Sequence, residues 1–418
     1  SKILTIDDFD FEGKTVLVRV DFNSPVDPET KKILDDTRIR MHGATIKELS
    51  DKGGKVVVLA HQGRPGEPDF IPLKQHAEIL SKVLGRPVKY VDDIYGEKAQ
   101  KAIKELKKGE ILVLENVRMY PNERKNKPPE EHAKSDFVKT LASLADVFVN
   151  DAFAAAHRSH ASIVGFTVLL PTIAGRIMER EIKALNKVLY EAERPCIYIL
   201  GGAKADDSLA ITQYVLSNDI ADNVLTGGIV GHLFLMARGV DIGSTNAKLI
   251  EKMELTPLIP GIKEVFKEYP GRIETPVDVA VEVDGKRVEI PVSSLPTESP
   301  IYDIGTETIE KYRKIIGEAK TIVISGPLGV FEKEEFAKGT RSILEAIAES
   351  DAYTLVGGGH TVAATEKLGL AEKMSYVSTA GGALIAYLMG EKLPGAVSYT
   401  HLRAHETRHD LVCRLLLE

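Results

Sequence analysis

Short apolar runs alternate with longer amphipathic segments along almost the whole of this chain. In segments 44–53 and 71–85, apolar residues fall three or four apart among charged residues, which is the spacing of a helix. Strands that alternate with helices predict an α/β fold, with parallel sheets covered by helices on both faces. The expected strands are Thr15–Val20, Lys55–Ala60, Ile111–Leu114, Val147–Val149, Ile197–Leu200, Asn223–Leu225, Thr321–Ile324, Thr354–Val356 and Tyr376–Val377.

The length of 418 residues favours two domains rather than one. We expect a hinge at about 165–180, where the first set of strands passes into a long helix and Pro171 and Gly175 interrupt the pattern. The predicted domains are 1–170 and 171–395. Within the second, Asp284-Gly285 separates two alternating runs and predicts a β-hairpin.

Composition excludes several classes of protein. The chain has 54 basic and 61 acidic side chains, the opposite of the balance typical of nucleic-acid binding. No apolar run approaches the roughly 20 residues of a membrane span. Cys196 and Cys413 cannot build a disulfide framework, and the acidic N-terminal segment does not have the layout of a signal peptide. We therefore expect a cytoplasmic protein in which Cys196 is a core residue.

The last segment, 396–418, differs in composition from the rest of the chain. From Val397 onward, His401, His405 and His409 have a spacing that would align them on one helix face like metal ligands. Nothing nearby in the sequence supplies the second layer of hydrogen bonds that a metal site needs. We favour a terminal segment foreign to the fold and assign no metal ligands.

Polar and basic residues follow the expected strands of the first domain. Ligands bind beyond the carboxyl ends of strands in such sheets, and guanidinium groups suit carboxylate and phosphate oxygens. Any one cation could be an ordinary surface residue, but several arginines at strand ends favour a site for a small, highly anionic substrate. Arg38 lies just before an expected helix. The candidate residues are Asp21, Phe22, Asn23, Arg38, His61, Gln62, Gly63, Arg64, Arg118 and Arg158.

Glycine-rich turns follow the strands of the second domain. Glycine lets backbone N–H groups at helix N-termini approach phosphates closely, so these turns predict a nucleotide site. Glu332 could accept hydrogen bonds from ribose hydroxyls. The Walker, protein-kinase and dinucleotide-binding motifs are all absent. The candidate residues are Gly201, Gly202, Lys204, Glu332, Gly358, Gly359, His360 and Thr361.

From about Thr15 to Gly395 these motifs resemble those of phosphoglycerate kinases. Arg19–Asn23, His61–Pro65, Leu114–Arg118, Asn150–Phe153 and His157-Arg158 are similar to the substrate-domain motifs of that family; Gly201–Lys204, Gly326–Glu332 and Gly357–Thr361 are similar to its nucleotide-domain motifs. The resemblance implies two Rossmann-like domains joined by a hinge. The first would bind 3-phosphoglycerate or 1,3-bisphosphoglycerate, and the second ADP or ATP with Mg²⁺.

The resemblance also implies roles for particular residues. Arg38 and Lys204 would approach the transferred phosphoryl group from opposite domains, Mg²⁺ would neutralise the nucleotide phosphates, and hinge closure would exclude water. The other candidate residues would bind the two substrates. We expect a monomer rather than a dimer.

Two residues depart from the pattern of many family members. Ser208 stands where they have a second lysine, and His360 where they often have an aspartate associated with the metal. This form resembles archaeal members, so we expect a lineage variant with retained activity. A neutral imidazole is a poor magnesium ligand, and the residues that hold Mg²⁺ stay unassigned.

Two other functions stay open from sequence. An NAD-dependent dehydrogenase could use a similar sheet, although the missing dinucleotide fingerprint argues against it. A non-catalytic nucleotide-binding protein would bind ligand without turnover, whereas an anion site together with a nucleotide site favours chemistry between them.

Overall fold

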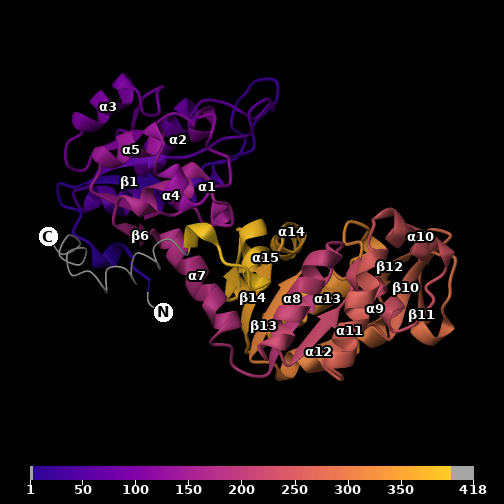
Figure 1. The fold of residues 1–418 in the computed structure, drawn as a ribbon. Helices are drawn as coiled ribbons and strands as arrows, with labels where there is room; N and C mark the ends of the chain where they lie inside the picture. Colours follow the sequence, from indigo (N-terminus) through magenta and orange to yellow (C-terminus); the bar gives the residue numbers. More distant parts are fainter. Residues whose placement is uncertain (1–2, 397–418) are drawn as a thin grey trace. The chain divides into compact units, whose positions relative to one another are not determined.

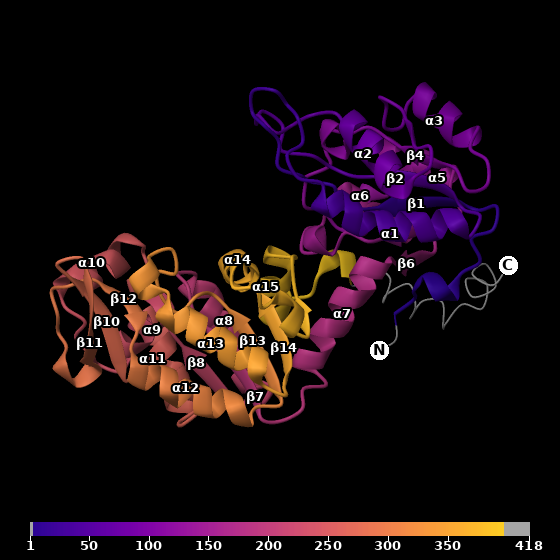
Figure 2. The ribbon, with the colours of Figure 1, turned by 180° about the vertical axis from the view of Figure 1, so that it is seen from behind.

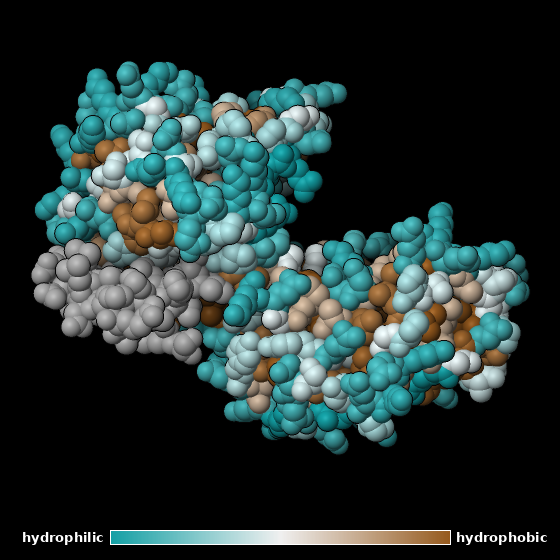
Figure 3. Space-filling model, viewed as in Figure 1, coloured by the Kyte–Doolittle hydropathy of each residue, from teal (hydrophilic) through white to brown (hydrophobic). Residues whose placement is uncertain are grey.

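The computed structural model describes residues 3–396. It divides into two compact units, one formed by the chain up to Ile182 with the segment from Lys392, and the other by Lys183–Glu391 (Figure 1). Each unit is built around a parallel sheet with helices on both faces, as the views from opposite sides show (Figures 1 and 2). Hydrophilic side chains cover most of the visible face of both units (Figure 3).

The first unit contains a six-stranded sheet in the order β3-β4-β2-β1-β5-β6, in which every pairing is parallel. Its strands are β1 (Thr15–Arg19), β2 (Lys55–Leu59), β3 (Lys89–Tyr90), β4 (Ile111–Val113), β5 (Val147–Asn150) and β6 (Thr172–Ala174). Its helices are α1 (Thr37–Asp51), α2 (Lys74–Leu84), α3 (Glu97–Lys104), α4 (Pro129–His132), α5 (Asp136–Ser143) and α6 (Ala161–Val164).

Alternation along the strands of the first unit separates two cores. Val16 and Val18 pack with Ile46 of α1 on one face, whereas Leu17 between them packs with Phe137 of α5 on the other. Successive side chains of a strand point to opposite faces, so a strand covered on both faces must be apolar throughout. This is why the strands appear in the sequence as continuous apolar runs.

The second unit has its six-stranded parallel sheet in the order β15-β14-β13-β7-β8-β9. The strands are β7 (Cys196–Leu200), β8 (Asn223–Thr226), β9 (Ile273–Glu274), β13 (Thr321–Ser325), β14 (Tyr353–Gly357) and β15 (Tyr376–Val377). The helices, beginning with α7, which crosses the boundary between the units, are α7 (Arg176–Leu189), α8 (Ala205–Ser217), α9 (Gly228–Ala237), α10 (Ser244–Lys252), α11 (Ile259–Glu268), α12 (Thr306–Glu318), α13 (Lys338–Glu349), α14 (Gly359–Lys367) and α15 (Gly382–Leu388).

A small antiparallel sheet is inserted into the second unit, with strands β10 (Asp278–Val283), β11 (Lys286–Pro291) and β12 (Ile301–Ile304). Its first two strands form the expected hairpin. Asp284 and Gly285 both have positive φ, at 49° and 76°, which is the backbone geometry that a two-residue hairpin turn requires.

The expected strands are all present, and Cys196 is buried in β7 as expected. The short strands β3, β6, β9 and β12 were not predicted. The first expected helix begins earlier, at Thr37, so Arg38 lies inside the first turn of α1 rather than before it. The predicted boundary at 170/171 differs from the division of the compact units after Ile182, because β6 pairs with β5 and stays in the first sheet.

Two further findings concern residues 3–396. None of the helices there is long and apolar enough to cross a membrane. The same residues contain no group of three or more histidines, cysteines or carboxylates arranged to hold a metal ion. His401, His405 and His409 lie outside this part of the chain.

Candidate active site

The site in the first unit is organised around the carboxyl end of β1. This strand lies between β2 and β5, and the strands that follow it in the sequence are added on both sides of it. The point at which the strand order reverses is the usual ligand site of an open α/β sheet. Asp21, just beyond β1, is 3% exposed. Its Oδ1 accepts a hydrogen bond from the Asn23 backbone N–H at 3.0 Å, and its Oδ2 accepts one from Arg38 at 2.6 Å. Asp21 therefore fixes one edge of the Arg38 guanidinium, while 41% of the Arg38 side chain stays exposed.

Hydrogen bonds tie together the loops that follow β1, β2 and β4. The Asn23 Oδ1 atom accepts from the Gly63 N–H at 2.8 Å, and Arg118 Nη1 donates to the Gly63 carbonyl at 2.6 Å. Gly63 has φ +70°, and a Cβ there would lie 2.5 Å from the Asp69 carbonyl. A larger residue would push these loops apart, so glycine is required at this crossing.

Basic side chains converge at this end of the sheet. Burial lowers the pKa of Arg118 to about 10, with further contributions from Arg19, Arg158 and Arg124. The pKa of His160 falls to about 3, first because the ring is buried and then because Arg19, Arg158 and Arg118 repel a second positive charge. Each of these cations therefore acts on the others, and the clustered charge is arranged to receive an anion.

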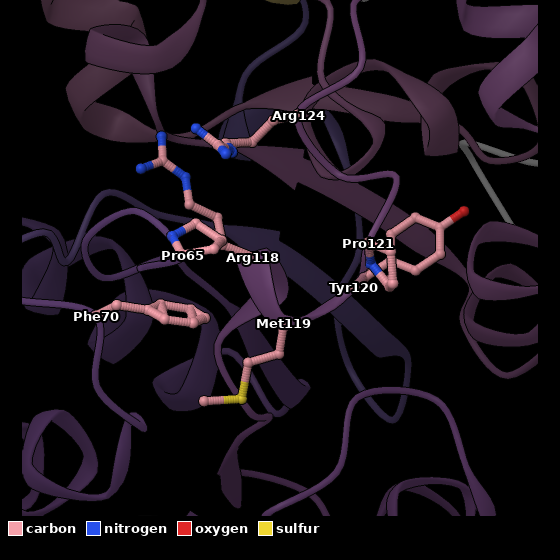
Figure 4. A pocket seen from close by; sticks show the side chains of 7 residues that line it. All are labelled: Pro65, Phe70, Arg118, Met119, Tyr120, Pro121 and Arg124. Atoms are coloured by element: carbon pink, nitrogen blue, oxygen red, sulfur yellow. The ribbon is translucent and has the colours of Figure 1, made fainter. Parts of the chain in front are cut away.

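A hollow of about 470 Å³ opens beside this cluster. Figure 4 shows the guanidinium groups of Arg118 and Arg124 side by side in it, with Phe70 and Met119 below them. None of the residues that line this hollow is a carboxylate. Arg124 was not predicted from the sequence because this residue follows a 3₁₀ turn, Val117–Met119, and not a strand. A position several residues beyond such a turn has no sequence pattern that marks it as part of a ligand site.

The structure gives the predicted residues of the first unit unequal positions. Asp21, Asn23, His61, Gly63, Arg38, Arg118 and Arg158 belong to the cluster described above. Arg64 is exposed and makes no hydrogen bond or ion pair with any residue in 3–396. The side chains of Phe22 and Gln62 are fully buried: Phe22 is part of the core, and Gln62 bonds the Ser24 backbone.

Glycines at the centre of the second unit let two loops approach very closely. The Gly201 N–H donates to Ser325 and the Gly202 N–H to Pro327, both on the loop side of β13, at 2.9 and 2.7 Å. A Cβ at Gly201 would lie 2.3 Å from the Pro327 carbonyl oxygen, and one at Gly326 would lie 2.2 Å from that of Gly201. Neither position has room for a side chain.

Helix N-termini surround these loops. Lys204 is the exposed residue before α8, and Gly358, with φ +84°, precedes α14. The Thr361 hydroxyl, in the first turn of α14, accepts a hydrogen bond from the Gly326 N–H at 2.6 Å. Gly359 and His360, at the start of α14, are exposed, as is Glu332 in the segment that follows β13. Free N–H groups and the positive ends of helix dipoles at such an edge suit phosphate groups.

A family model described as phosphoglycerate kinase matches residues 6–391. The chain belongs to the phosphoglycerate kinase family. Two phosphoglycerate kinases from methanogens are similar over nearly the whole chain: that of Methanobacterium bryantii is 53% identical, covering 93% of this chain and 95% of its own, and that of Methanothermus fervidus is 49% identical, covering 94% and 96%. The expected resemblance to archaeal members is thus confirmed.

Solved phosphoglycerate kinase structures show the same fold. That of Pyrococcus horikoshii OT3 has a TM-score of 0.83 at 44% identity, covering 95% of this chain and 98% of its own. That of Coxiella burnetii has the same TM-score at 33% identity, covering 96% and 99%. The two parallel-sheet domains are confirmed. As a phosphoglycerate kinase, the chain catalyses the glycolytic phosphoryl transfer between 1,3-bisphosphoglycerate and ADP, and the dehydrogenase and non-catalytic alternatives are set aside.

Proposed function

We propose that the cationic end of the first sheet binds phosphoglycerate and that the glycine-lined end of the second sheet binds the nucleotide. One observation carries the first assignment: Arg118 and Arg124 line the same hollow, and no carboxylate lines it with them. A ligand with a carboxylate and phosphate groups would bring negative charge into this hollow. Lys204 and Gly359 support the second assignment, because both are exposed at helix N-termini, α8 and α14, and such helix ends suit phosphate groups.

Arg38 and Lys204 would contact the transferred phosphoryl group, one from each unit. Phosphoryl transfer asks little covalent chemistry of the protein, so these cations would act by positioning the phosphoryl group and stabilising its charge. Asp21 would hold Arg38 in place through their ion pair. In this proposal the triose-phosphate domain is 1–170 and the nucleotide domain is 171–395. A hinge at about 165–180 would close them and exclude water from the reacting groups.

Mg²⁺ would be held mainly by phosphate oxygens of the nucleotide. Magnesium usually takes one or two carboxylates together with substrate phosphates, and it keeps several waters. Lys204 and His360 are not magnesium ligands. The carboxylates of the nearby turns, which could supply one or two ligands, are Asp206, Asp207 and Glu332. The residues present therefore fit an ion that binds together with the nucleotide. When bound, the ion neutralises charge on the phosphates.

We also propose that the protein is a cytoplasmic monomer. Several of the exposed large apolar side chains within residues 3–396, such as Leu34, Tyr190 and Val288, lie singly on separate elements. The Cys196 thiol is free and buried, as expected in a reducing compartment.

A coupled assay tests the proposal. The full chain is given 1,3-bisphosphoglycerate and ADP, with and without Mg²⁺, and ATP formation is followed. We expect turnover that depends on Mg²⁺ and on both substrates. Binding of both ligands without ATP formation would contradict the proposed transfer of the phosphoryl group between the two sites.

A further inference from the structure

Arg19, the last residue of β1, is one of the largest fully buried side chains in the described structure, with 1% exposure. Its Nε donates to the Ser162 hydroxyl at 2.8 Å, and its Nη1 donates to the Val20 carbonyl at 2.5 Å. Its Nη2 lies 3.0 Å from Nδ1 of His61. The guanidinium is therefore held on three sides, and one of its contacts is a residue of the anion site.

The contact between Arg19 and His61 fixes where the imidazole carries its proton. A guanidinium has only donors, so His61 Nδ1 must accept the hydrogen bond and cannot itself be protonated. A neutral ring then carries its hydrogen on Nε2. Burial holds the pKa of His61 well below its ordinary value, and Arg19, Arg118 and Arg38 lower it further against the opposing effect of Asp21.

The Nε2 atom of His61 is directed away from these contacts. It has no hydrogen-bond partner among residues 3–396, and it is not one of the fully buried side-chain nitrogens without a hydrogen bond in this part of the chain, as Nδ1 of His76 is. The Nε2–H of His61 is thus open to solvent on a ring that is otherwise 7% exposed.

We propose that Arg19 is a positioning residue that locks His61 as the Nε2–H tautomer, so that His61 serves the anion site as a fixed hydrogen-bond donor. Carboxylate and phosphate oxygens are acceptors only, and a donor that neither rotates nor loses its proton is suited to them. The inference rests on the proposed binding of phosphoglycerate at this site. It makes His61 a binding group, with no part in proton transfer.

A buried carboxylate keeps Arg19 in this position. Glu123, 1% exposed, accepts hydrogen bonds from the backbone N–H and the hydroxyl of Ser162 at 2.7 and 2.5 Å. The same hydroxyl accepts from Arg19 Nε, and a Glu123 oxygen lies 3.9 Å from Arg19 Nη2. Ser162 therefore bridges the two charged groups and helps to hold the Arg19 guanidinium beside His61.

Nitrogen-15 NMR of the histidine side chains in the free protein tests the lock directly. We expect His61, assigned by comparison with His61→Gln, to show an unprotonated Nδ1 and a protonated Nε2 throughout the pH range in which free histidine titrates. In Arg19→Met the two tautomers should interconvert. The double variant Arg19→Met/Glu123→Gln, which removes both charges of the buried Arg19–Glu123 pair, provides the same measurement if the single variant fails to fold. A protonated Nδ1 in the native protein would overturn the proposal, as would an unchanged nitrogen pattern in these variants.

Two substitutions of His61 separate the positions of its nitrogens in the assay. Glutamine places an amide N–H near the Nε2 position, whereas asparagine reaches only the Nδ1 position. We expect KM for 3-phosphoglycerate to be at least about fivefold lower in His61→Gln than in His61→Asn, since one charge-assisted hydrogen bond is at stake. Equal KM values would overturn the donor role. Addition of 3-phosphoglycerate should shift the His61 nitrogen resonances. If it does not, although His61 is the Nε2–H tautomer, the proposed substrate site is wrong but the positioning of His61 by Arg19 is still supported.

Discussion

The Arg38 guanidinium donates to Oδ2 of Asp21 at 2.6 Å, joining the first turn of α1 to the end of β1. Asp21 is buried at 3% exposure, whereas Arg38 keeps 41% of its side chain exposed. Burial of Asp21 works against its ionisation, but the Arg38 guanidinium and the hydrogen bond from the Asn23 N–H hold its pKa below the ordinary value. Asp21 thus stays charged and orients an arginine whose remaining donors face solvent.

Replacing Arg38 should therefore damage the reaction much more than the fold. We expect Arg38→Ala to lower kcat by about 10³-fold or more, as the loss of a transition-state cation does in phosphoryl transfer. The loss of stability should be smaller, because the buried Asp21 carboxylate loses its ion-pair partner but keeps its hydrogen bond from the Asn23 N–H. Steady-state kinetics and thermal unfolding measure the two effects.

Arg40→Ala is the matched control. Arg40 lies on the same helix, pairs with Asp36 at 3.0 Å and has a side chain that is 63% exposed. Its removal changes the net charge by the same amount, so kcat should stay close to that of the parent chain. Similar losses in both variants would mean that only the net charge of α1 matters.

Arg124 should contribute to binding of the phosphoglycerate substrate. It lines the same hollow as Arg118 and has no ion-pair partner in the described part of the chain. We expect Arg124→Ala to raise KM for 3-phosphoglycerate by about tenfold and to leave KM for ATP unchanged, as for the loss of one hydrogen bond to a charged group. Lys125→Ala, which removes the same charge one residue away and outside the hollow, should change neither value by more than about twofold.

The fold was predictable because each central strand is buried on both faces. Val16, Leu17 and Val18 must all be apolar to serve two cores, and this leaves a continuous run in the sequence. Short edge strands such as β3, with two residues, bury little and leave no such run. The hairpin was predictable for a different reason, because Asp284-Gly285 has the positive φ values that few other residue pairs adopt.

The candidate site was only partly predictable. Residues at the ends of strands, such as Arg118, could be placed by the rule that governs parallel sheets. Arg124 could not, because a turn carries it into the hollow and local sequence does not determine where such a turn points. The roles of Arg19 and Glu123 depend on contacts between segments more than 100 residues apart, as in the Arg19–Ser162 bond, and no pattern within one segment records such a contact.

Gly201 should be required for the shape of the nucleotide edge. A Cβ there would lie 2.3 Å from the Pro327 carbonyl oxygen, a backbone atom that cannot move alone. We expect Gly201→Ala to lower the free energy of unfolding by about 1–3 kcal/mol and to weaken ADP binding. Gly317→Ala is the control, because Gly317 is exposed in α12 with no atom within 4 Å of a Cβ. It should stabilise the protein by about 0.5–1 kcal/mol, and denaturant unfolding measures both variants.

Protonation of His160 should destabilise the protein in mild acid. Its pKa is about 3 in the folded state and close to the ordinary 6.5 when unfolded, so below pH 6.5 the unfolded chain binds the extra proton. The contribution is fully present above that pH. Between about pH 7.5 and about pH 5 it should lose about 1–2 kcal/mol, the lower figure allowing for solvent screening. Denaturant unfolding across this range should show a shallower pH dependence in His160→Gln, and an unchanged slope would contradict the neutral, buried ring.

The separation of the two substrate sites between the two units is tested most directly by isothermal titration of matched variants with 3-phosphoglycerate and ADP. We expect Arg118→Ala to weaken 3-phosphoglycerate binding at least about tenfold while ADP binds as before, and Lys204→Ala to show the reverse. A substitution in either unit that weakens both ligands equally, or only the ligand assigned to the other unit, would contradict the account.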